Sequence, residues 1–164
     1  MSKEEIIDVI NEQNIVIGQM TKRDSYKQRV SHRIVHVIVF DGEKLYIPKR
    51  SLKVGYLPGY FCTSAGGHVQ AGESSEVAAL RELEEEIGLG GPVHHVEDFF
   101  FNHEFKVHVS LYIKQFNHET DFIILDPSEV DSGYFYTLQQ IYELDKSQFH
   151  PQLFHCLKKV EKLF

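Results

Sequence analysis

Three glutamates near the middle of the chain have the side-chain type and the spacing of a cation site. Glu82, Glu85 and Glu86 are three and four residues apart, so on a helix they share one face. Carboxylate oxygens suit Mg²⁺ or Mn²⁺, and Mg²⁺ usually keeps positions open for water and substrate phosphates. The same spacing is typical of a solvated acidic face, where like charges repel by roughly 0.2–0.5 kcal/mol per pair. Spacing alone therefore leaves both interpretations open.

A helix must position these carboxylates. The pattern predicts an amphipathic helix over residues 74–89, with Ser74 as the N-cap, Glu76 in the first turn and Gly88 as the C-cap. At about 100° per residue, the apolar side chains of this segment form one stripe: Ala79, Leu80, Leu83 and Ile87. The glutamates fall outside that stripe, so we expect them to lie away from the core.

Strands and a second helix surround this segment. A turn at Asp41-Gly42 separates two β-branched and apolar runs, which predicts a hairpin. The predicted strands are 33–40, 44–50, 61–64, 93–101, 105–116 and 122–125, and the predicted terminal helix is 148–164. The fold class is therefore α+β, with a sheet covered by helices.

The composition sets limits on the class of protein. The 164 residues have a net charge of −7, 42% hydrophobic residues and two cysteines, which is typical of a single globular domain without a disulfide framework. We find no repeat or linker, so residues 1–164 are expected to form one domain, with 1–31 as an N-terminal leader. The acidic start is unlike a signal peptide, and no apolar run approaches about 18 residues. We expect a cytoplasmic protein that neither enters a membrane nor coats nucleic acid.

The glutamates belong to a longer pattern, from Gly67 to Leu89. Gly67 is followed by five residues, Glu73, seven residues and then Arg81-Glu82-Leu83-any-Glu85-Glu86-any-Gly88-Leu89. This pattern resembles the complete signature of the Nudix hydrolases, with no substitution at a defining position. The resemblance implies a mixed β-sheet sandwiched between α-helices, in which residues 67–89 form a loop-helix-loop. It also implies hydrolysis of a diphosphate linked to another group, with Mg²⁺ or Mn²⁺.

The resemblance also implies a role for each matching residue. Glu82, Glu85 and Glu86 match the metal ligands, and the carbonyl of Gly66 is a further ligand. Arg81 matches the residue that orients the glutamates, and Glu73 matches the one that braces the helix. The general base varies in the family: Glu85 is one candidate, and the alternatives outside the motif are Glu104, Glu119 and Asp121.

Segments outside the motif resemble the branch related to isopentenyl-diphosphate isomerase. They are His32-Arg33 with the following strand, IPKRS, Leu57-Pro58-Gly59, the run TSAGGHV and the leader segment 9–24. The isomerase's catalytic cysteine directly precedes the Gly-His pair, but here that position is Gly66. Cys62 lies four residues earlier, and we interpret it as a small buried residue. The intact glutamates favour a hydrolase over an isomerase or a non-catalytic nucleotide-binding module.

Further candidates come from this branch and from the strand ends. His32 and His68 match isomerase metal positions but are equally typical of structural histidines, and a loose match includes His103, Glu104 and His108. Lys49 and Arg50 end a strand that faces the motif loop in this fold, where a cation can bind phosphate or remain on the surface. Tyr56, Tyr60 and Phe61 could stack on a base or simply pack. The expected partner is a small phosphorylated molecule, and a homodimer is a candidate because dimers are common in the family.

Overall fold

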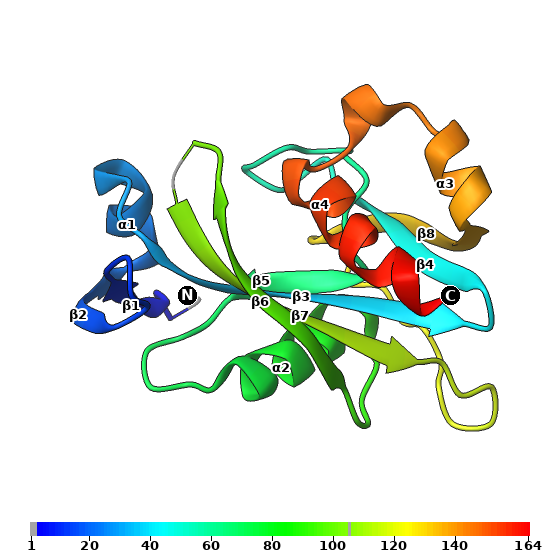
Figure 1. The fold of residues 1–164 in the computed structure, drawn as a ribbon, viewed down its shortest axis with the longest axis horizontal. Helices are drawn as coiled ribbons and strands as arrows, with labels where there is room; N and C mark the ends of the chain where they lie inside the picture. Colours follow the sequence, from blue (N-terminus) through cyan, green and yellow to red (C-terminus); the bar gives the residue numbers. More distant parts are fainter. Residues whose placement is uncertain (1–2, 105) are drawn as a thin grey trace.

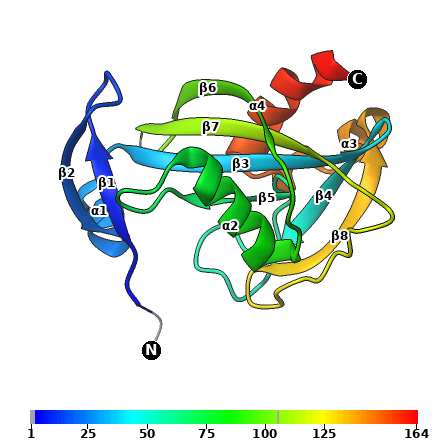
Figure 2. The same ribbon diagram turned by 90° about the horizontal axis from the view of Figure 1, so that it is seen from below.

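A mixed eight-stranded sheet lies between two helices in the computed structural model, which describes residues 3–104 and 106–164. Helix α2 covers one face of the sheet and α4 covers the other (Figures 1 and 2). The predicted α+β sandwich is therefore confirmed. The elements are β1 (Ile6–Ile10), β2 (Val16–Thr21), α1 (Lys22–Gln28), β3 (His32–Asp41), β4 (Lys44–Arg50), β5 (Ala65–His68), α2 (Ser75–Ile87), β6 (His94–Asn102), β7 (Lys106–Gln115), β8 (Val130–Thr137), α3 (Leu138–Glu143), η1 (Lys146–Gln148), α4 (Pro151–Val160) and η2 (Glu161–Leu163).

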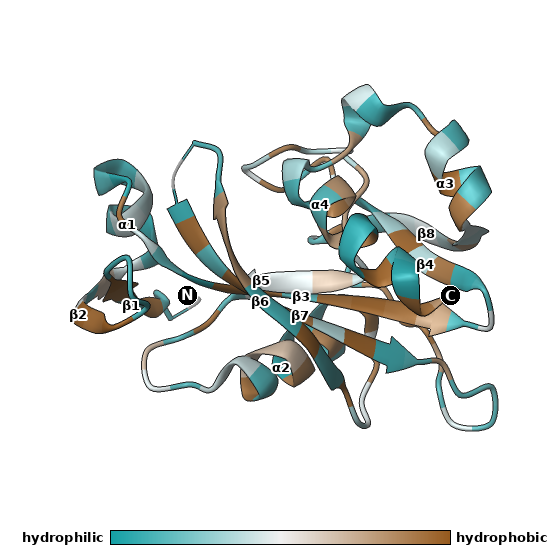
Figure 3. Cartoon of the chain, in the orientation of Figure 1, coloured by the Kyte–Doolittle hydropathy of each residue, from teal (hydrophilic) through white to brown (hydrophobic). Residues whose placement is uncertain are grey.

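Strand β3 is the centre of the sheet. It pairs antiparallel with β1, β4 and β5 and parallel with β7. Because side chains alternate along a strand, β3 contributes to both faces. Val35, Val37 and Val39 pack in one cluster with α2, whereas Ile38 packs in the other with α4. Figure 3 shows hydrophobic residues along the strands between these two helices.

Helix α2 follows its predicted pattern closely. The Ser74 hydroxyl accepts a hydrogen bond from the Val77 backbone N–H, and Gly88 ends the helix at a φ of 71°, where a side chain would be strained. Leu83 and Ile87 are fully buried. The caps and the core stripe are thus confirmed, and together they fix the rotation of the glutamate face.

The predicted strand at 122–125 is wrong, and the missing strand is β8. Residues 122–125 form an irregular segment beside the end of α2, where the Ile124 N–H donates to the Ile87 carbonyl at 2.9 Å. All four residues are apolar, but only Ile123 and Leu125 pack against the cluster under α2, whereas Phe122 and Ile124 are exposed. Strand β8 instead pairs antiparallel with β4.

Two other boundaries differ from the prediction. In the region of 61–64 only isolated bridges at Phe61 form, and the strand is β5, four residues later. The terminal helix begins at Pro151 rather than 148, because proline suits the first turn, where no N–H donor is needed. The predicted start of another strand at residue 105 lies outside the described residues.

The leader folds against the rest of the chain. Its described part, from residue 3, forms β1, β2 and α1, and β1 pairs with β3 through Val9 and His32. The Ala71 N–H donates to the Ile6 carbonyl at 2.8 Å, which ties β1 to the motif loop. No helix within the described ranges is both long and apolar enough to cross a membrane.

Candidate functional site

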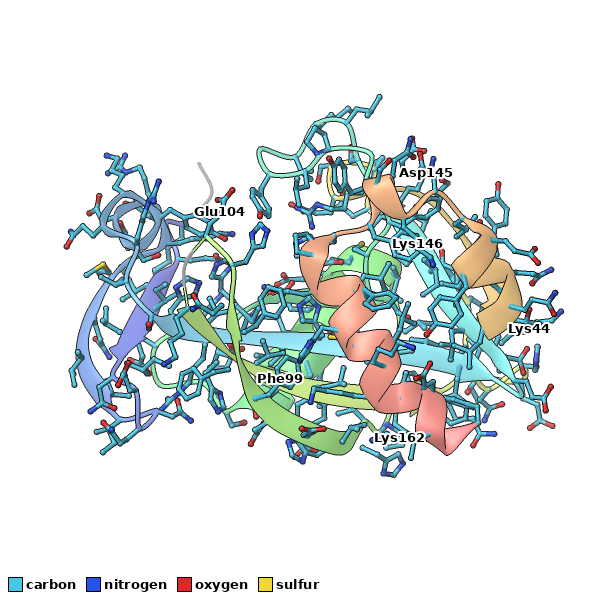
Figure 4. All side chains as sticks on the ribbon, turned by 45° about the horizontal axis from the view of Figure 1, so that its top comes forward. Lys44, Phe99, Glu104, Asp145, Lys146 and Lys162 are labelled. Carbon is cyan, nitrogen blue, oxygen red and sulfur yellow. The ribbon has the colours of Figure 1, made fainter. Side chains whose placement is uncertain are left out.

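A cleft of about 950 Å³ contains most of the sequence-predicted site residues. Its walls come from the leader, the loop after β4, β5, α2, the β6–β7 hairpin and the first turn of α4. Figure 4 labels Glu104 at the tip of that hairpin, across from the start of α4. The predicted residues in the lining are Gly66, Glu82, Glu85, Glu86, Arg50, Glu104, His32 and His68.

Arg81 joins the acidic residues of the motif. Its Nε and Nη2 atoms donate to the two Glu73 carboxylate oxygens at 2.9 and 3.0 Å. Its Nη1 donates to Glu82 Oε1 at 2.8 Å and to Glu85 Oε2 at 3.3 Å. Nη2 also donates to the His68 carbonyl at 2.9 Å. One guanidinium therefore ties the helix to β5 and to the loop before the helix, a geometry that a fork of donors permits.

Burial and repulsion act on the two glutamates nearest the cleft floor. Glu82 is only 7% exposed, and its burial raises its pKa although the Arg81 hydrogen bond opposes this. Burial, followed by repulsion from Glu82, raises the pKa of Glu86 well above its usual range. A divalent cation bound between Glu82 and Glu86 would offset both the desolvation of the carboxylates and the repulsion between them, because it neutralises their negative charge.

The oxygen donors of Glu82, Glu85, Glu86 and Gly66 are of the type that binds a hard cation, but the three carboxylates do not converge on a common position. Among the described residues, no three His, Cys, Asp or Glu side chains are close enough together to hold a metal ion. The Glu85 side chain is 58% exposed, and its carboxylate is turned to Arg81, 3.3 Å from Nη1. All-oxygen ligation of this kind suits Mg²⁺ or Mn²⁺.

Gly67 leaves room for the Glu82 carboxylate. A Cβ atom at position 67 would lie 2.3 Å from Glu82 Oε1 and 2.5 Å from its Cδ. No side chain fits there unless Glu82 moves. The first glycine of the motif is therefore required by a side chain fifteen residues later in the chain.

We expect Gly67→Ala to lower kcat about 100-fold while the protein remains folded, because the methyl group displaces Glu82 by about an ångström from its position. Steady-state kinetics and thermal unfolding measure the two effects. Gly18→Ala is the matched control, since a Cβ at Gly18 on β2 meets no atom within 4 Å. Full activity in Gly67→Ala would contradict this account of the glycine.

The two predicted phosphate-binding cations separate in the structure. Arg50 lines the cleft and its Nε donates to the Tyr56 carbonyl at 3.0 Å. Lys49 lies outside that cleft, with its Nζ 4.7 Å from the centre of the Phe61 ring. The pairing of β4 with β8 shifts register between Lys49 and Arg50, and only Arg50 is among the described residues that line the cleft. The structure does not bring Lys49 together with the other candidate residues, and a role for it in phosphate binding stays a prediction.

His32 and His68 come together as a ring cluster with Tyr26 of α1. The two imidazole centroids are 5.1 Å apart, and Tyr26 Oη lies 3.1 Å from His68 Nε2. The His32 Nδ1–H donates to the Val30 carbonyl at 3.0 Å. Burial lowers the pKa of both histidines, so both rings are neutral at physiological pH.

Some of the remaining candidates line the cleft and others do not. Glu104, His103 and Tyr56 line the cleft, whereas Glu119 and Asp121 are not among its described lining residues. Lys114 Nζ binds Asp121 at 2.8 Å beyond β7. Tyr60, Phe61 and His108 also lie outside that lining. Cys62 is a buried free thiol whose pKa burial raises to about 12, as expected for a structural cysteine.

Several lining residues were missed by sequence reasoning. They are Glu5, Tyr26, His36, Glu129, His150 and Gln152. None belongs to a local motif, and they come from both ends of the chain as well as its centre. The pairing of β1 with β3 and of β8 with β4, and the packing of α4 on the sheet, bring them to the motif.

Comparisons with known proteins identify the family of the chain. The model of the NUDIX domain matches residues 30–157. An uncharacterised Nudix hydrolase of Yersinia pestis is 37% identical over 102 residues, covering 61% of this chain and 56% of that protein. The chain thus spans about half the length of the curated relatives it matches first.

Solved structures share the fold. A Deinococcus radiodurans crystal structure has a TM-score of 0.80 at 24% identity, covering 94% of this chain and 98% of that one. The NUDIX domain of Shewanella oneidensis NrtR, complexed with ADP ribose, has a TM-score of 0.68 at 14% identity, covering 88% of this chain and 100% of that one. The signature, its place on α2 and the family match lead to one conclusion: this chain belongs to the NUDIX domain family.

Proposed function

We propose that this protein hydrolyses a diphosphate bond in a nucleoside diphosphate or a nucleoside-diphosphate-linked molecule, with Mg²⁺ or Mn²⁺ as cofactor. The observation that carries this proposal is the Arg81 network, which holds Glu82 and Glu85 on the same cleft wall as Glu86 and Gly66. Members of the family act on such compounds generally, and the Shewanella domain is complexed with ADP ribose.

Residues on one wall of the cleft would bind the cation, and Arg50 on the other would bind the phosphate. Glu82, Glu85, Glu86 and the Gly66 carbonyl would hold the cation, which supplies charge neutralisation at the diphosphate and a more acidic bound water. Arg50, across the cleft, binds a phosphate oxygen with its fork of donors. Arg81 and Glu73 position the ligands without touching substrate. Glu85, the most exposed of the three, is our choice of general base, with Glu104 as the alternative.

The isomerase alternative meets a steric obstacle at Gly66. A Cβ at this position would lie 2.7 Å from the Val35 carbonyl oxygen and 2.8 Å from His36 Nδ1. The backbone of β3 cannot easily move, so a cysteine is not tolerated where the isomerase resemblance needs one. Cys62 does not replace it, because it is buried and its thiol is protonated at physiological pH.

A substrate panel tests the proposal. Nucleoside di- and triphosphates and nucleotide sugars are incubated with Mg²⁺ or Mn²⁺, and phosphate and nucleotide products are measured. We expect release that requires the cation and stops with a chelator. Absence of hydrolysis of every compound with either cation would refute the proposal, and proton exchange into isopentenyl diphosphate in heavy water would favour the isomerase.

The proposal extends to where the protein is located and to its oligomeric state. We propose a cytoplasmic enzyme, which the two free buried cysteines support. We also propose a homodimer, and sedimentation velocity of the purified chain measures its mass.

A further inference from the structure

We propose that the cleft contains a nucleobase subsite at the start of α4, where the Gln152 side-chain amide reads an acceptor on the base. This inference rests on the proposed function and names the part of the substrate that the metal face does not bind. The carrying observation is a chain of side chains, Thr63, His36 and Gln152, that fixes the amide at the cleft wall.

The hydrogen-bond partners of His36 determine how the amide points. His36 Nε2 is hydrogen-bonded to Gln152 Oε1, and because a carbonyl oxygen can only accept, the ring nitrogen is the donor. Because the proton of the neutral ring is on Nε2, His36 Nδ1 accepts a hydrogen bond from the Thr63 hydroxyl 2.6 Å away, so its other nitrogen is also engaged. Thr63 and His36 are both buried, and this fixes the ring in place.

The other end of the amide is left for a ligand. The Gln152 NH₂ group has no hydrogen-bond partner within residues 3–104 and 106–164, and Gln152 lines the cleft. It therefore presents two donors to whatever occupies that end. A ring nitrogen or a keto oxygen of a nucleobase is an acceptor of matching chemistry.

Aromatic surfaces lie beside this amide. The rings of Tyr56 and His150 are 5.8 Å apart and nearly perpendicular, and both line the cleft together with Phe101 of the β6–β7 hairpin. Every base has a flat face that packs on such rings, so these rings can bind a base without selecting among bases. Selection then falls to Gln152.

The charge at this end argues against a second phosphate position. Burial lowers the pKa of His150 to about 3, so its ring is neutral, and a phosphate would require cations there. Arg50 lines the same cleft, with its Nε fixed on the carbonyl of Tyr56, one of the aromatic residues. The cleft thus contains carboxylates for a metal, a guanidinium for a phosphate and neutral rings for a base.

The pairing of β3 with β5 places the proposed base subsite next to the proposed metal site. His36 pairs directly with Gly66 across β3 and β5, so the residue that orients Gln152 adjoins the carbonyl proposed for the cation. A base at Gln152 and a diphosphate at Glu86 thus share one continuous cleft.

The test compares nucleoside diphosphates with ribose 5-diphosphate, which lacks a base. In Gln152→Met we expect KM for nucleoside diphosphates to rise about tenfold with kcat within about twofold, because the two amide N–H donors that would bind the base are lost. KM for ribose 5-diphosphate should not change. Gln139→Met, on the exposed face of α3, is the matched control.

The outcomes separate this inference from the proposed function. If the wild-type protein cleaves no diphosphate, the proposed function fails. If it cleaves ribose 5-diphosphate and nucleoside diphosphates with equal KM, or if Gln152→Met raises both KM values alike, the base subsite is refuted while the hydrolase stands. The wild-type comparison needs no variant and remains decisive should Gln152→Met unfold.

Discussion

Glu86→Gln is expected to lower cation-dependent hydrolysis by at least about 1000-fold and, in metal-free protein, to raise the melting temperature. The loss of activity follows from removing a carboxylate that would hold the cation beside the diphosphate. The gain in stability follows from the pKa of Glu86, which burial and Glu82 raise well above the usual range. An ionised Glu86 is therefore a cost to the folded state that glutamine does not carry.

The raised pKa of Glu86 also makes the stability of the metal-free protein depend on pH. A carboxyl whose folded pKa is raised binds more protons in the folded than in the unfolded state between the two pKa values. Its stabilising contribution is complete below the unfolded pKa and is lost as pH rises through the folded pKa. Metal-free wild-type protein should thus lose stability from mildly acidic toward neutral pH more than Glu86→Gln does.

Thermal unfolding with and without Mn²⁺ and single-turnover kinetics measure these effects. Added Mn²⁺ should raise the melting temperature of the wild type but hardly that of Glu86→Gln. Glu84→Gln is the matched control, because Glu84 is exposed on the same helix and does not line the cleft. An active Glu86→Gln enzyme, or one destabilised in the absence of metal, would contradict the assignment.

The parts of the fold that sequence predicts best are those with local causes. Helix α2 needs only a capping serine, a terminal glycine and an apolar stripe, all within sixteen residues. The β3–β4 hairpin needs a glycine turn between two apolar runs, and the structure places that turn at Gly42 and Glu43, one residue after the predicted Asp41-Gly42. The glutamate face follows from α2 directly, since helical geometry places residues three and four apart on one side.

The parts that sequence did not predict depend on partners distant in the chain. Strand β8 carries few apolar residues on its outer side, and its identity comes from pairing with β4. Residues 122–125 are apolar like a strand, but the Ile124 N–H binds the carbonyl of Ile87 at the end of α2. In the site, His36 and Gln152 are 116 residues apart, and no periodicity within either segment connects them.

The second large effect is expected at Arg81, which holds the acidic residues in place. Arg81→Met would leave Glu73 and Glu82, whose side chains are 11% and 9% exposed, without their cation. Breaking a buried ion pair from one side typically costs about 3–5 kcal/mol, so we expect a loss of this order in the free energy of unfolding. Chemical denaturation measures it, and activity should fall with it because Glu82 and Glu85 lose their common donor.

Two companion variants distinguish charge from geometry. Arg81→Lys keeps the charge, but one ammonium cannot replace a fork that reaches Glu73, Glu82, Glu85 and the His68 carbonyl together, so stability should recover more than activity. In the double variant Arg81→Met with Glu73→Gln, one of the two unpaired carboxylates is gone while that of Glu82 remains, and part of the lost stability should return. If Arg81→Met were as stable as the wild type, the ion pairs would contribute nothing to folding. Full activity in Arg81→Lys would show instead that charge alone, without the fork, positions the metal ligands.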